Sequence, residues 1–216
     1  MKRHAIWTPP CDGARTHRVK AASGVPRPLH MWTTWMESPL GPLLLGATLD
    51  GVCTVAFGDC GARERQTGLL RRTSRCDIVP GAPPHLALLR KELSDYFLGA
   101  LTRFSVPIVA PGRPFQRQVW EGLLKIPYGE TRAYEEVAQQ IGRPGAARAV
   151  GNANGLNPIC ILVPCHRVIR KEGALGGYGG GLWRKTWLLD LEKRTVALGL
   201  EKRTVALGQA SHKRTG

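Results

Sequence analysis

Cys165 and His166, neighbours in this chain of 216 residues, pair a thiol with an imidazole, two side chains that carry out catalysis in many proteins. They follow a short apolar run at residues 159–163 and precede a polar, turn-like stretch at residues 170–173. We interpret the run as an interior strand that ends in a loop carrying the pair. A histidine beside a cysteine, at the end of a rigid element, can hold a thiolate where a substrate reaches it. Taken alone, the pair favours a simpler interpretation, in which Cys165 is a small buried hydrophobe of the core.

Upstream of this pair, the chain predicts two short helices with a glycine-containing turn between them, at about residues 133–141 and 145–154. Such a pair is typical of a helix-turn-helix, although a plain hairpin of two helices has the same pattern. The second helix consists almost entirely of small residues around a single long cation, Arg148. Small residues permit close approach to another surface, but packing against a helix would leave Arg148 awkwardly buried. The pattern therefore favours a DNA groove as the surface, with Arg148 as the probe.

The helices and strands predicted for the whole chain form two parts, separated by a Pro- and Gly-rich linker at residues 110–114. The first part predicts β-hairpins, a helix and a last strand, and it shows no site of its own. After the linker the chain is mainly helical, with a first helix that ends before Pro127. The elements expected in the first part are strands at residues 32–35, 43–48, 52–57 and 104–106 and a helix at residues 84–98.

These patterns indicate an α+β fold and a division of the chain into four segments. The first mixes Pro, Gly, Arg and His without an apolar period, which predicts disorder. The last contains a repeat, because Leu-Glu-Lys-Arg-Thr-Val-Ala-Leu-Gly occurs at residues 191–199 and again at 200–208. We interpret the repeat as a local duplication without a function, since the unit is too short for a solenoid. The segments are a disordered basic extension at 1–30, an N-terminal α/β module at 31–112, a mainly helical domain at 113–193 and a basic tail at 194–216.

Charge and composition narrow the class of protein. The formal net charge is +15, and residues 1–30 and 193–216 each contain six basic residues and one acidic residue, which leaves a moderately basic body. This distribution suits a polyanionic partner such as nucleic acid, although a merely solvated basic surface would look the same. Hydrophobic residues make up 43% of the chain, but no apolar stretch is long enough for a bilayer, so we expect no membrane partner.

The six cysteines favour free thiols over a disulfide framework. None forms a Cys-x-x-Cys pair and no secretory segment precedes them, which predicts a reducing, cytoplasmic setting. Zinc would be a use for Cys11 with His17, or for Cys160 with Cys165 and His166. Neither grouping has the paired spacing of a structural zinc site, so we expect no metal and no other cofactor.

Together these residues resemble the O6-alkylguanine-DNA alkyltransferases over about residues 113–193, and Ser-Pro-Leu-Gly at residues 38–41 extends the likeness weakly. The five-residue cysteine motif in combination with the Arg148 helix is highly specific. The resemblance implies a ribonuclease H-like N-terminal module and a winged-helix-like C-terminal domain that carries the helix-turn-helix. The segments that carry it are Gly-Glu-Thr at 129–131, Arg-Ala-Val-Gly-Asn at 148–152, Asn-Pro at 157–158, Pro-Cys-His-Arg-Val at 164–168, Gly-Tyr-Gly-Gly-Gly at 177–181 and Lys185.

The resemblance implies direct reversal of DNA alkylation damage, in which Cys165 takes the alkyl group from O6 of guanine, and from O4 of thymine, in double-stranded DNA. A thiolate is the soft nucleophile that suits attack on a saturated carbon. His166 would take the Cys165 proton through a bridging water, with Glu192 holding the imidazole. Tyr134 would neutralise the departing guanine, and Asn157 would brace the turn that carries the site. Nothing in the sequence removes the alkyl group, so each molecule is expected to act once.

The resemblance also implies that the protein, as a monomer, binds the minor groove and rotates the damaged nucleotide out of the stack. Arg148 would fill the space that the base leaves, in a complex almost indifferent to sequence. The expected DNA-binding residues are Ala147, Arg148, Ala149, Gly151 and Asn152, and the expected substrate-pocket residues are Tyr178, Gly179 and Lys185.

Two positions depart from the family pattern, and two other classes of protein stay open. Ala133 stands where relatives commonly carry Ser or Thr, which predicts the loss of one hydrogen bond near Tyr134. Cys160 stands where many carry Pro, and it could widen the pocket, add a second alkylatable thiol or have no effect. A thiol hydrolase would also use a cysteine, a histidine and a carboxylate, but it needs no Arg148 helix. A DNA-binding regulator would need that helix but not Cys165.

Overall fold

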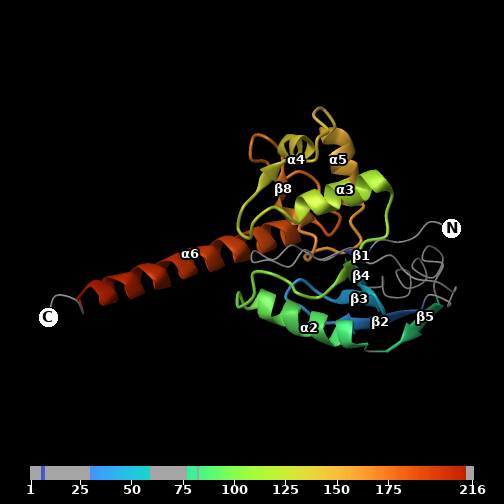
Figure 1. Ribbon diagram of the computed structural model, residues 1–216, viewed down its shortest axis with the longest axis horizontal. Coiled ribbons are helices and arrows are strands. Elements are labelled where there is room, and N and C mark those ends of the chain that lie inside the picture. The colour runs from blue at the N-terminus through green and yellow to red at the C-terminus, as the bar shows by residue number, and fades with distance from the viewer. Residues whose placement is uncertain (1–5, 8–29, 59–76, 82, 213–216) are drawn as a thin grey trace.

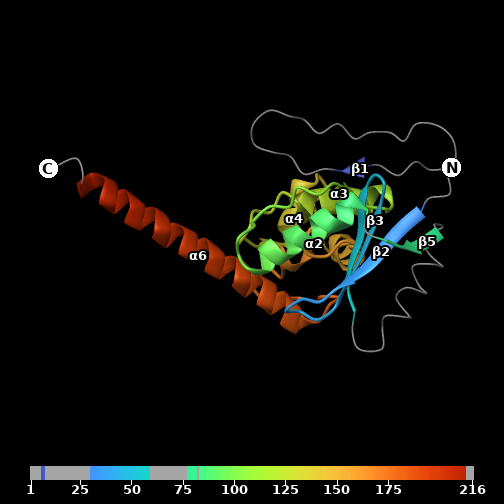
Figure 2. The same ribbon diagram turned by 90° about the horizontal axis from the view of Figure 1, so that it is seen from below.

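The structure, a computed structural model, describes residues 6–7, 30–58, 77–81 and 83–212 (Figure 1). These residues form a six-stranded mixed sheet with a helix, followed in the chain by a group of helices with a two-stranded sheet. The sequence predicted this α+β architecture correctly. The last helix, α6 (Leu182–His212), starts between the two parts and projects far beyond both (Figures 1 and 2).

The six-stranded sheet is built on the hairpins that the sequence predicted. The turn between its first two long strands closes where the Gly41 amide donates to the Ser38 carbonyl at 3.0 Å. Gly41 has a φ of 89°, a conformation that glycine adopts without a steric penalty. Across the sheet the order is β1 (Ile6–Trp7), β6 (Ile108–Val109), β4 (Gly51–Phe57), β3 (Leu43–Thr48), β2 (His30–Met36) and β5 (Asp77–Pro80). The pairs β2–β3, β3–β4 and β1–β6 are antiparallel, and β2–β5 and β4–β6 are parallel.

The last strand of the N-terminal module lies later in the chain than predicted. Residues 104–106 were expected to form it, but the structure has β6 two residues beyond them. The carboxylate of Glu92 accepts hydrogen bonds from the amides of Ser105, at 3.0 Å, and Val106, at 3.2 Å. Because these amides already donate to a side chain, they do not pair with a neighbouring strand.

Helix α2 (Pro84–Phe97) connects the sheet with the helical part through a shared core. It begins with proline in its first turn, where the missing amide donor costs nothing. Its inner side chains are fully buried, and Tyr96 is the bulkiest of them. The cluster continues without a break into the second part, so the two parts are packed as one hydrophobic core. Its members include Leu86, Leu89, Leu93 and Tyr96 of α2 and Val119, Trp120, Val150, Ile159 and Leu162 beyond the linker.

The helical part contains the predicted helix-turn-helix. Its two helices are α4 (Tyr134–Gln140) and α5 (Ala147–Gly155), close to the predicted bounds, and both pack against α3 (Pro114–Leu123). A two-stranded parallel sheet joins β7 (Arg132–Ala133) to β8 (Val168–Ile169). Tyr134 follows β7 directly and Cys165 lies three residues before β8, so this small sheet brings both residues to one side of the domain.

The apolar run at residues 159–163 is not a strand, and the prediction of an interior strand there is wrong. Only Ile159 makes a bridge, to Val55 of β4, and the following residues form a tight turn. After Pro164 the chain forms a single 3-10 turn, η1 (Cys165–Arg167). Periodicity does not separate a short buried strand from another buried segment, which explains the error.

The two ends of the chain also differ from the expectation. Strand β1 lies within residues 1–30, for which disorder was predicted, and the rest of that segment up to residue 29 lies outside the described residues. The predicted tail at 194–216 is, up to His212, the outer part of α6, in keeping with its content of good helix formers. In the part of the chain that the structure describes, no helix is both long and apolar enough to cross a membrane.

Candidate active site

The turn that leads to Cys165 is fixed by the side chain of Asn157. The Asn157 Oδ1 accepts from the amide of Ile159 at 3.0 Å, and its Nδ2 donates to the carbonyl of Val163 at 2.8 Å. Ile161, at the tip of the turn, has a φ of 73°, the only positive φ at a described residue other than glycine. A β-branched residue seldom adopts this conformation, so the Asn157 hydrogen bonds and the surrounding core must maintain it.

The single turn η1 aims its three side chains in three directions. A 3-10 helix has three residues per turn, so successive side chains are rotated by about 120°. Cys165 faces a cavity, whereas His166 and Arg167 turn inward to a shared partner, Glu192. The Asn154 Nδ2 of α5 donates to the Cys165 carbonyl at 3.3 Å, which ties η1 to the helix-turn-helix.

Glu192 is the centre of a buried charged cluster behind Cys165. Its Oε1 lies 2.9 Å from the His166 Nε2, and Arg167 donates to both carboxylate oxygens, from Nε and Nη2, at 2.9 Å each. Burial alone would raise the pKa of the Glu192 carboxyl, but the hydrogen bonds and charges of His166 and Arg167 outweigh it and hold that pKa well below its usual range. Because a carboxylate only accepts hydrogen bonds, the His166 Nε2 carries the proton.

At neutral pH His166 is a neutral imidazole, and its other nitrogen, Nδ1, is available. Its side chain is fully buried, and burial lowers the pKa of the imidazole despite the opposing effect of Glu192. The His166 Nδ1 has no hydrogen-bond partner among the described residues. A neutral ring whose acceptor nitrogen is unpaired has the protonation state of a general base.

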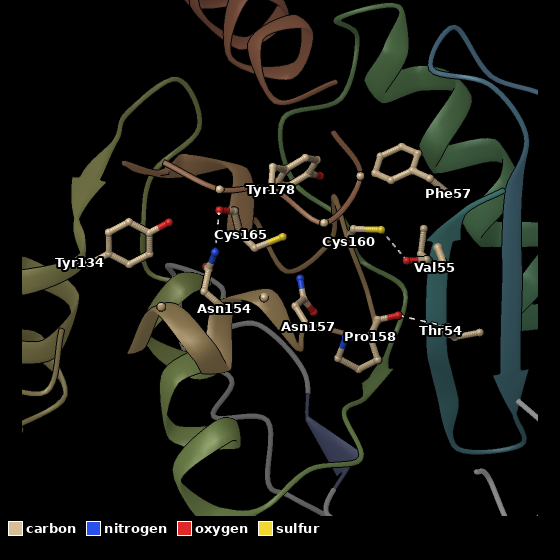
Figure 3. Close-up of a pocket in the computed structure, with 16 residues that line it drawn as sticks. Thr54, Val55, Phe57, Tyr134, Asn154, Asn157, Pro158, Cys160, Cys165 and Tyr178 are labelled. Carbon is tan, nitrogen blue, oxygen red and sulfur yellow. Dashed lines mark hydrogen bonds between the residues drawn. The ribbon is translucent and has the colours of Figure 1, made fainter. Parts of the chain in front are cut away.

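Cys165 lines a cavity of about 570 Å³ (Figure 3). In this view Tyr134 lies on one side of Cys165, and Cys160 and Phe57 lie on the other. Three regions of the chain form the wall of the cavity: β4, the helix-turn-helix with the turn after it, and the glycine-rich loop at residues 176–181, which precedes α6. The lining residues are Thr54, Val55, Ala56, Phe57, Tyr134, Gly151, Asn154, Gly155, Asn157, Pro158, Cys160, Cys165, Gly177, Tyr178, Gly179 and Gly180.

The glycine-rich loop closes one end of this cavity against β4. A Cβ added to Gly180 would lie 2.5 Å from the Phe57 ring, so the loop backbone reaches this position only as glycine. Tyr178 meets the edge of Phe57 with ring centroids 6.2 Å apart, and the Arg184 guanidinium covers the Phe57 ring at 4.7 Å. Phe57 therefore anchors the loop, and it comes from the N-terminal module in which the sequence showed no site.

Two thiols face the cavity, but their surroundings differ. Burial raises the pKa of Cys165, and the Asn157 amide and the Lys185 ammonium partly offset this rise. Burial and the neighbouring Cys165 raise the pKa of Cys160 far above its usual range. The Cys160 thiol also donates to the carbonyl of Val55. Cys165 is thus the thiol next to groups that favour a thiolate, and Cys160 is held in its neutral form.

Lys185 was predicted to be a substrate-pocket residue, and it is not among the residues that line the cavity. Its side chain is fully buried behind the wall, where the ammonium donates to the carbonyl of Val168 at 2.6 Å and to that of Leu175. Burial lowers the pKa of Lys185 to about 8, while the nearby Cys165 acts in the opposite direction. Lys185 joins the start of β8 to the residue before the glycine-rich loop and brings positive charge toward the thiol. Of the other predicted pocket residues, Tyr178 and Gly179 do line the cavity.

Tyr134 borders the cavity at the start of α4. Burial raises the pKa of its phenol, the nearby Cys165 adds to the rise, and Arg170 opposes it. Ala133 caps α4 without a side-chain hydrogen bond, and its amide donates instead to the carboxylate of Glu136. The Tyr134 hydroxyl is therefore a protonated group beside the thiol, as a proton donor must be.

Helix α5 divides the predicted DNA-binding residues between the cavity and the outer surface. Gly151 lines the cavity, and its Cα carries no side chain to separate α5 from Tyr134. The side chains of Arg148, Ala149 and Asn152 are exposed, and Ala147 is half-buried. Arg148 is thus a solvent-facing cation on the helix that borders the cavity.

Most of the site residues that the sequence did not reveal lie outside the cysteine motif at residues 164–168. The β4 residues that line the cavity carried no signal, because their pattern is that of any buried strand. Arg167 belongs to the cysteine motif but received no role before its bonds to Glu192 were visible. Cys11 and His17 lie outside the described residues, and within the described ones no group of three His, Cys, Asp or Glu could hold a metal ion.

Comparison with known proteins gives consistent matches over both parts of the chain. Residues 31–110 match the family described as "6-O-methylguanine DNA methyltransferase, ribonuclease-like domain", and residues 114–194 match its "DNA binding domain". The chain is 62% identical over 159 residues to the methylated-DNA–protein-cysteine methyltransferase of Mycolicibacterium paratuberculosis, covering 74% of this chain and 90% of the relative. It is 47% identical over 161 residues to that of Mycobacterium leprae, covering 74% of this chain and 92% of the relative.

Solved structures show the same likeness. The crystal structure of Mycobacterium tuberculosis OGT in complex with DNA matches with a TM-score of 0.65 and 47% identity, covering 77% of this chain and 94% of that one. The structure of the Mycobacterium tuberculosis O6-methylguanine methyltransferase matches with a TM-score of 0.65 and 45% identity over the same shares.

Proposed function

This chain belongs to the 6-O-methylguanine DNA methyltransferase family, and from that premise we propose that Cys165 is the residue onto which it transfers the alkyl group. Its activity is that of a methylated-DNA–protein-cysteine methyltransferase, which repairs DNA by moving an alkyl group to a cysteine of the protein. The observation that carries the assignment is that Cys165 faces the cavity while His166, beside it, is held by Glu192.

The proton of Cys165 passes to the Nδ1 of His166 through a water molecule. The ring is neutral, its Nε2 proton is committed to Glu192, and its Nδ1 lacks a partner among the described residues. Glu192 steadies the positive charge that the ring gains, and Arg167 keeps Glu192 ionised. Asn157 supports this step indirectly, because it holds the turn on which Cys165 lies.

The thiolate then forms a bond from its sulfur to the alkyl carbon, and the bond from that carbon to O6 of guanine breaks. The electron pair of the broken bond stays on the base, which takes a proton from the Tyr134 hydroxyl. Burial and the nearby thiol keep this hydroxyl protonated until the base accepts the proton. Tyr134 recovers its proton from solvent and His166 loses its own, so the net change is one proton moved from Cys165 to the base.

The substrate is double-stranded DNA that contains O6-alkylguanine or O4-alkylthymine. Such a base must leave the stack to enter the cavity, and helix α5 brings Arg148 and Asn152 to the surface beside it. Ala147, Ala149 and Gly151 are small enough for this helix to approach the minor groove closely, and Tyr178, Gly179 and, from behind, Lys185 support the pocket. The protein acts as a monomer in the cytoplasm, where the thiols at Cys53, Cys160 and Cys165 remain reduced.

Each molecule acts once, because none of the described residues of the site can remove the alkyl group from the thioether formed at Cys165. The test is to titrate the protein with a duplex that contains O6-methylguanine and to measure restored guanine at completion. We expect a plateau at one repaired base per protein molecule. Continued turnover would indicate a hydrolase, and unrepaired DNA despite binding would indicate a regulator.

A further inference from the structure

Glu192 receives one hydrogen bond from outside its own domain. Its carboxylate is fully buried and accepts from five donor atoms of the described residues. Four of them belong to the helical part, and the fifth is the hydroxyl of Tyr96, on α2 of the N-terminal module. The donors are Tyr96 Oη at 2.7 Å, His166 Nε2 and Arg167 Nη2 at 2.9 Å to Oε1, and Gly129 N and Arg167 Nε at 2.9 Å to Oε2.

We propose that Tyr96 is a positioning residue for the alkyl transfer, acting through Glu192 on His166. This inference rests on the proposed function of the site. The Tyr96 hydroxyl and the His166 Nε2 donate to the same oxygen of Glu192, so they compete for its negative charge. A carboxylate with more donors attracts each of their protons less strongly. Tyr96 therefore limits how firmly Glu192 stabilises a protonated His166 and helps to keep the ring a neutral base.

The ring of Tyr96 is held in place by an aromatic cluster, with its hydroxyl bonded to Glu192. The side chain is fully buried among three aromatic rings, with centroid distances of 5.7 Å to Phe97, 5.4 Å to Phe104 and 5.9 Å to Tyr128. Burial raises the pKa of the Tyr96 phenol well above its usual value, and Glu192 raises it further. The hydroxyl therefore stays protonated throughout the physiological pH range and donates a hydrogen bond to Glu192.

A variant and a matched control separate this role from simple packing. Tyr96→Phe removes the hydroxyl and keeps the ring. Tyr128→Phe makes the same change in the same aromatic cluster, at a hydroxyl that has no bond to Glu192. We expect Tyr96→Phe to raise the pKa of His166 by on the order of half a unit. The acid limb of the pH profile of the transfer rate should move to higher pH by the same amount. Tyr128→Phe should leave the limb where it is in the wild type.

The experiment measures single-turnover transfer from a duplex with O6-methylguanine between pH 5 and 8, about one and a half units on either side of an ordinary histidine pKa. The His166 ring is titrated by NMR in the same full-length variants without DNA. An upward shift in both profiles for Tyr96→Phe alone supports the proposal. A slower rate with an unmoved limb and an unmoved His166 titration overturns it, because that is the signature of a packing role.

A double variant keeps the test decisive if Tyr96→Phe also lowers the stability. In a Glu192→Gln background the shared acceptor has no charge, so adding Tyr96→Phe should change the His166 titration no further. An equal shift in both backgrounds would overturn the route through Glu192. If wild-type protein left Cys165 unmodified, the proposed function would fail, yet the NMR titrations would still decide whether Tyr96 acts on His166.

Discussion

Residues 114–194 supply every group to which we assign a step of the reaction, whereas residues 31–110 supply contacts that hold those groups in place. The helical part contributes Cys165, His166 and Tyr134, which lie within a short stretch of chain. The N-terminal module contributes β4 as a wall of the cavity and the hydroxyl of Tyr96 as a ligand of Glu192. The reactive groups are recognisable by type, and the supporting groups are recognisable only by position.

The two regions meet at the turn that carries the site. The Val55 amide donates to the carbonyl of Pro158 at 2.9 Å, and the Cys160 amide returns a bond to the carbonyl of Val55 at 3.0 Å. The Thr54 hydroxyl adds a third bond, also to Pro158, at 3.1 Å. The turn is therefore braced from within by Asn157 and from outside by β4. A module without a reactive group can thus still set the geometry of the reaction.

The largest expected effect concerns the two thiols of the cavity. Cys165→Ala should abolish transfer of the methyl group while DNA binding persists, because it removes the nucleophile and leaves α5 untouched. Cys160→Ala, the matched control, should retain transfer at close to the wild-type yield. Gel-shift and methyl-transfer assays on the same duplex check both. Transfer by Cys165→Ala, or its loss in Cys160→Ala alone, would reverse the assignment.

The next effect tests the exposed cation of α5. Arg148→Ala should slow repair of duplex DNA by roughly 10- to 100-fold, because a flipped base costs a few kcal/mol that Arg148 no longer offsets. The reaction with free O6-benzylguanine should keep its rate, since no base has to leave a stack. Parallel rate measurements with the two substrates check this. Equal losses with both would exclude a role in flipping.

Asn157→Ala tests the inner brace. The Ile159 amide loses its acceptor in a buried turn, so we expect a loss of about 2 kcal/mol in the free energy of unfolding, with slower transfer. Asn152→Ala, on the exposed face of α5, should change that free energy by less than about 0.5 kcal/mol. Chemical denaturation of both variants measures the difference. A stable Asn157→Ala protein with a normal rate would show that the core alone maintains the turn.

Thr54→Val tests the outer brace and should have a smaller effect. Valine keeps the shape of the side chain, and the Pro158 carbonyl still accepts from Val55, so the expected loss of stability is about 1 kcal/mol. Thr54→Ser keeps the hydroxyl and should restore most of the transfer rate. Denaturation and single-turnover rates check both variants. If Thr54→Val matched the wild type in stability and in transfer rate, β4 would line the cavity without bracing the turn.

The smallest effect is a dependence of stability on pH that originates in the helical part. The pKa of His166 is lowered in the folded protein, so below about pH 6.5 the unfolded chain binds a proton that the folded protein does not. The stabilisation is fully present above that pH and is lost as the pH falls. Denaturation at pH 7.5 and pH 5.5 should give a larger free energy of unfolding at the higher pH. His166→Gln should reduce this difference, and an unchanged difference would assign it to other groups.

The sequence predicted the fold and the site to different depths, for physical reasons. Cys165 with His166, the Arg148 helix and the hairpins were predictable, because local spacing and residue type specify them. The turn at 159–163 was not, because its shape depends on the hydrogen bonds of Asn157 and on contact with β4. Tyr96 and Thr54 act across the interface of two modules, so no local pattern marks them. Lys185 was assigned to the pocket by resemblance, and only its bonds to Val168 and Leu175 show that it lies behind the wall.

Peptide mass spectrometry after reaction with a methylated duplex shows which sulfur of the protein accepts the alkyl group. Cys160 and Cys165 share one cavity, so the spectrum must assign the methyl group to one sulfur or the other. Our account predicts a single methyl group on Cys165, in an amount equal to the guanine restored. Restored guanine with an unmodified Cys165, or with the methyl group on Cys160, would contradict it.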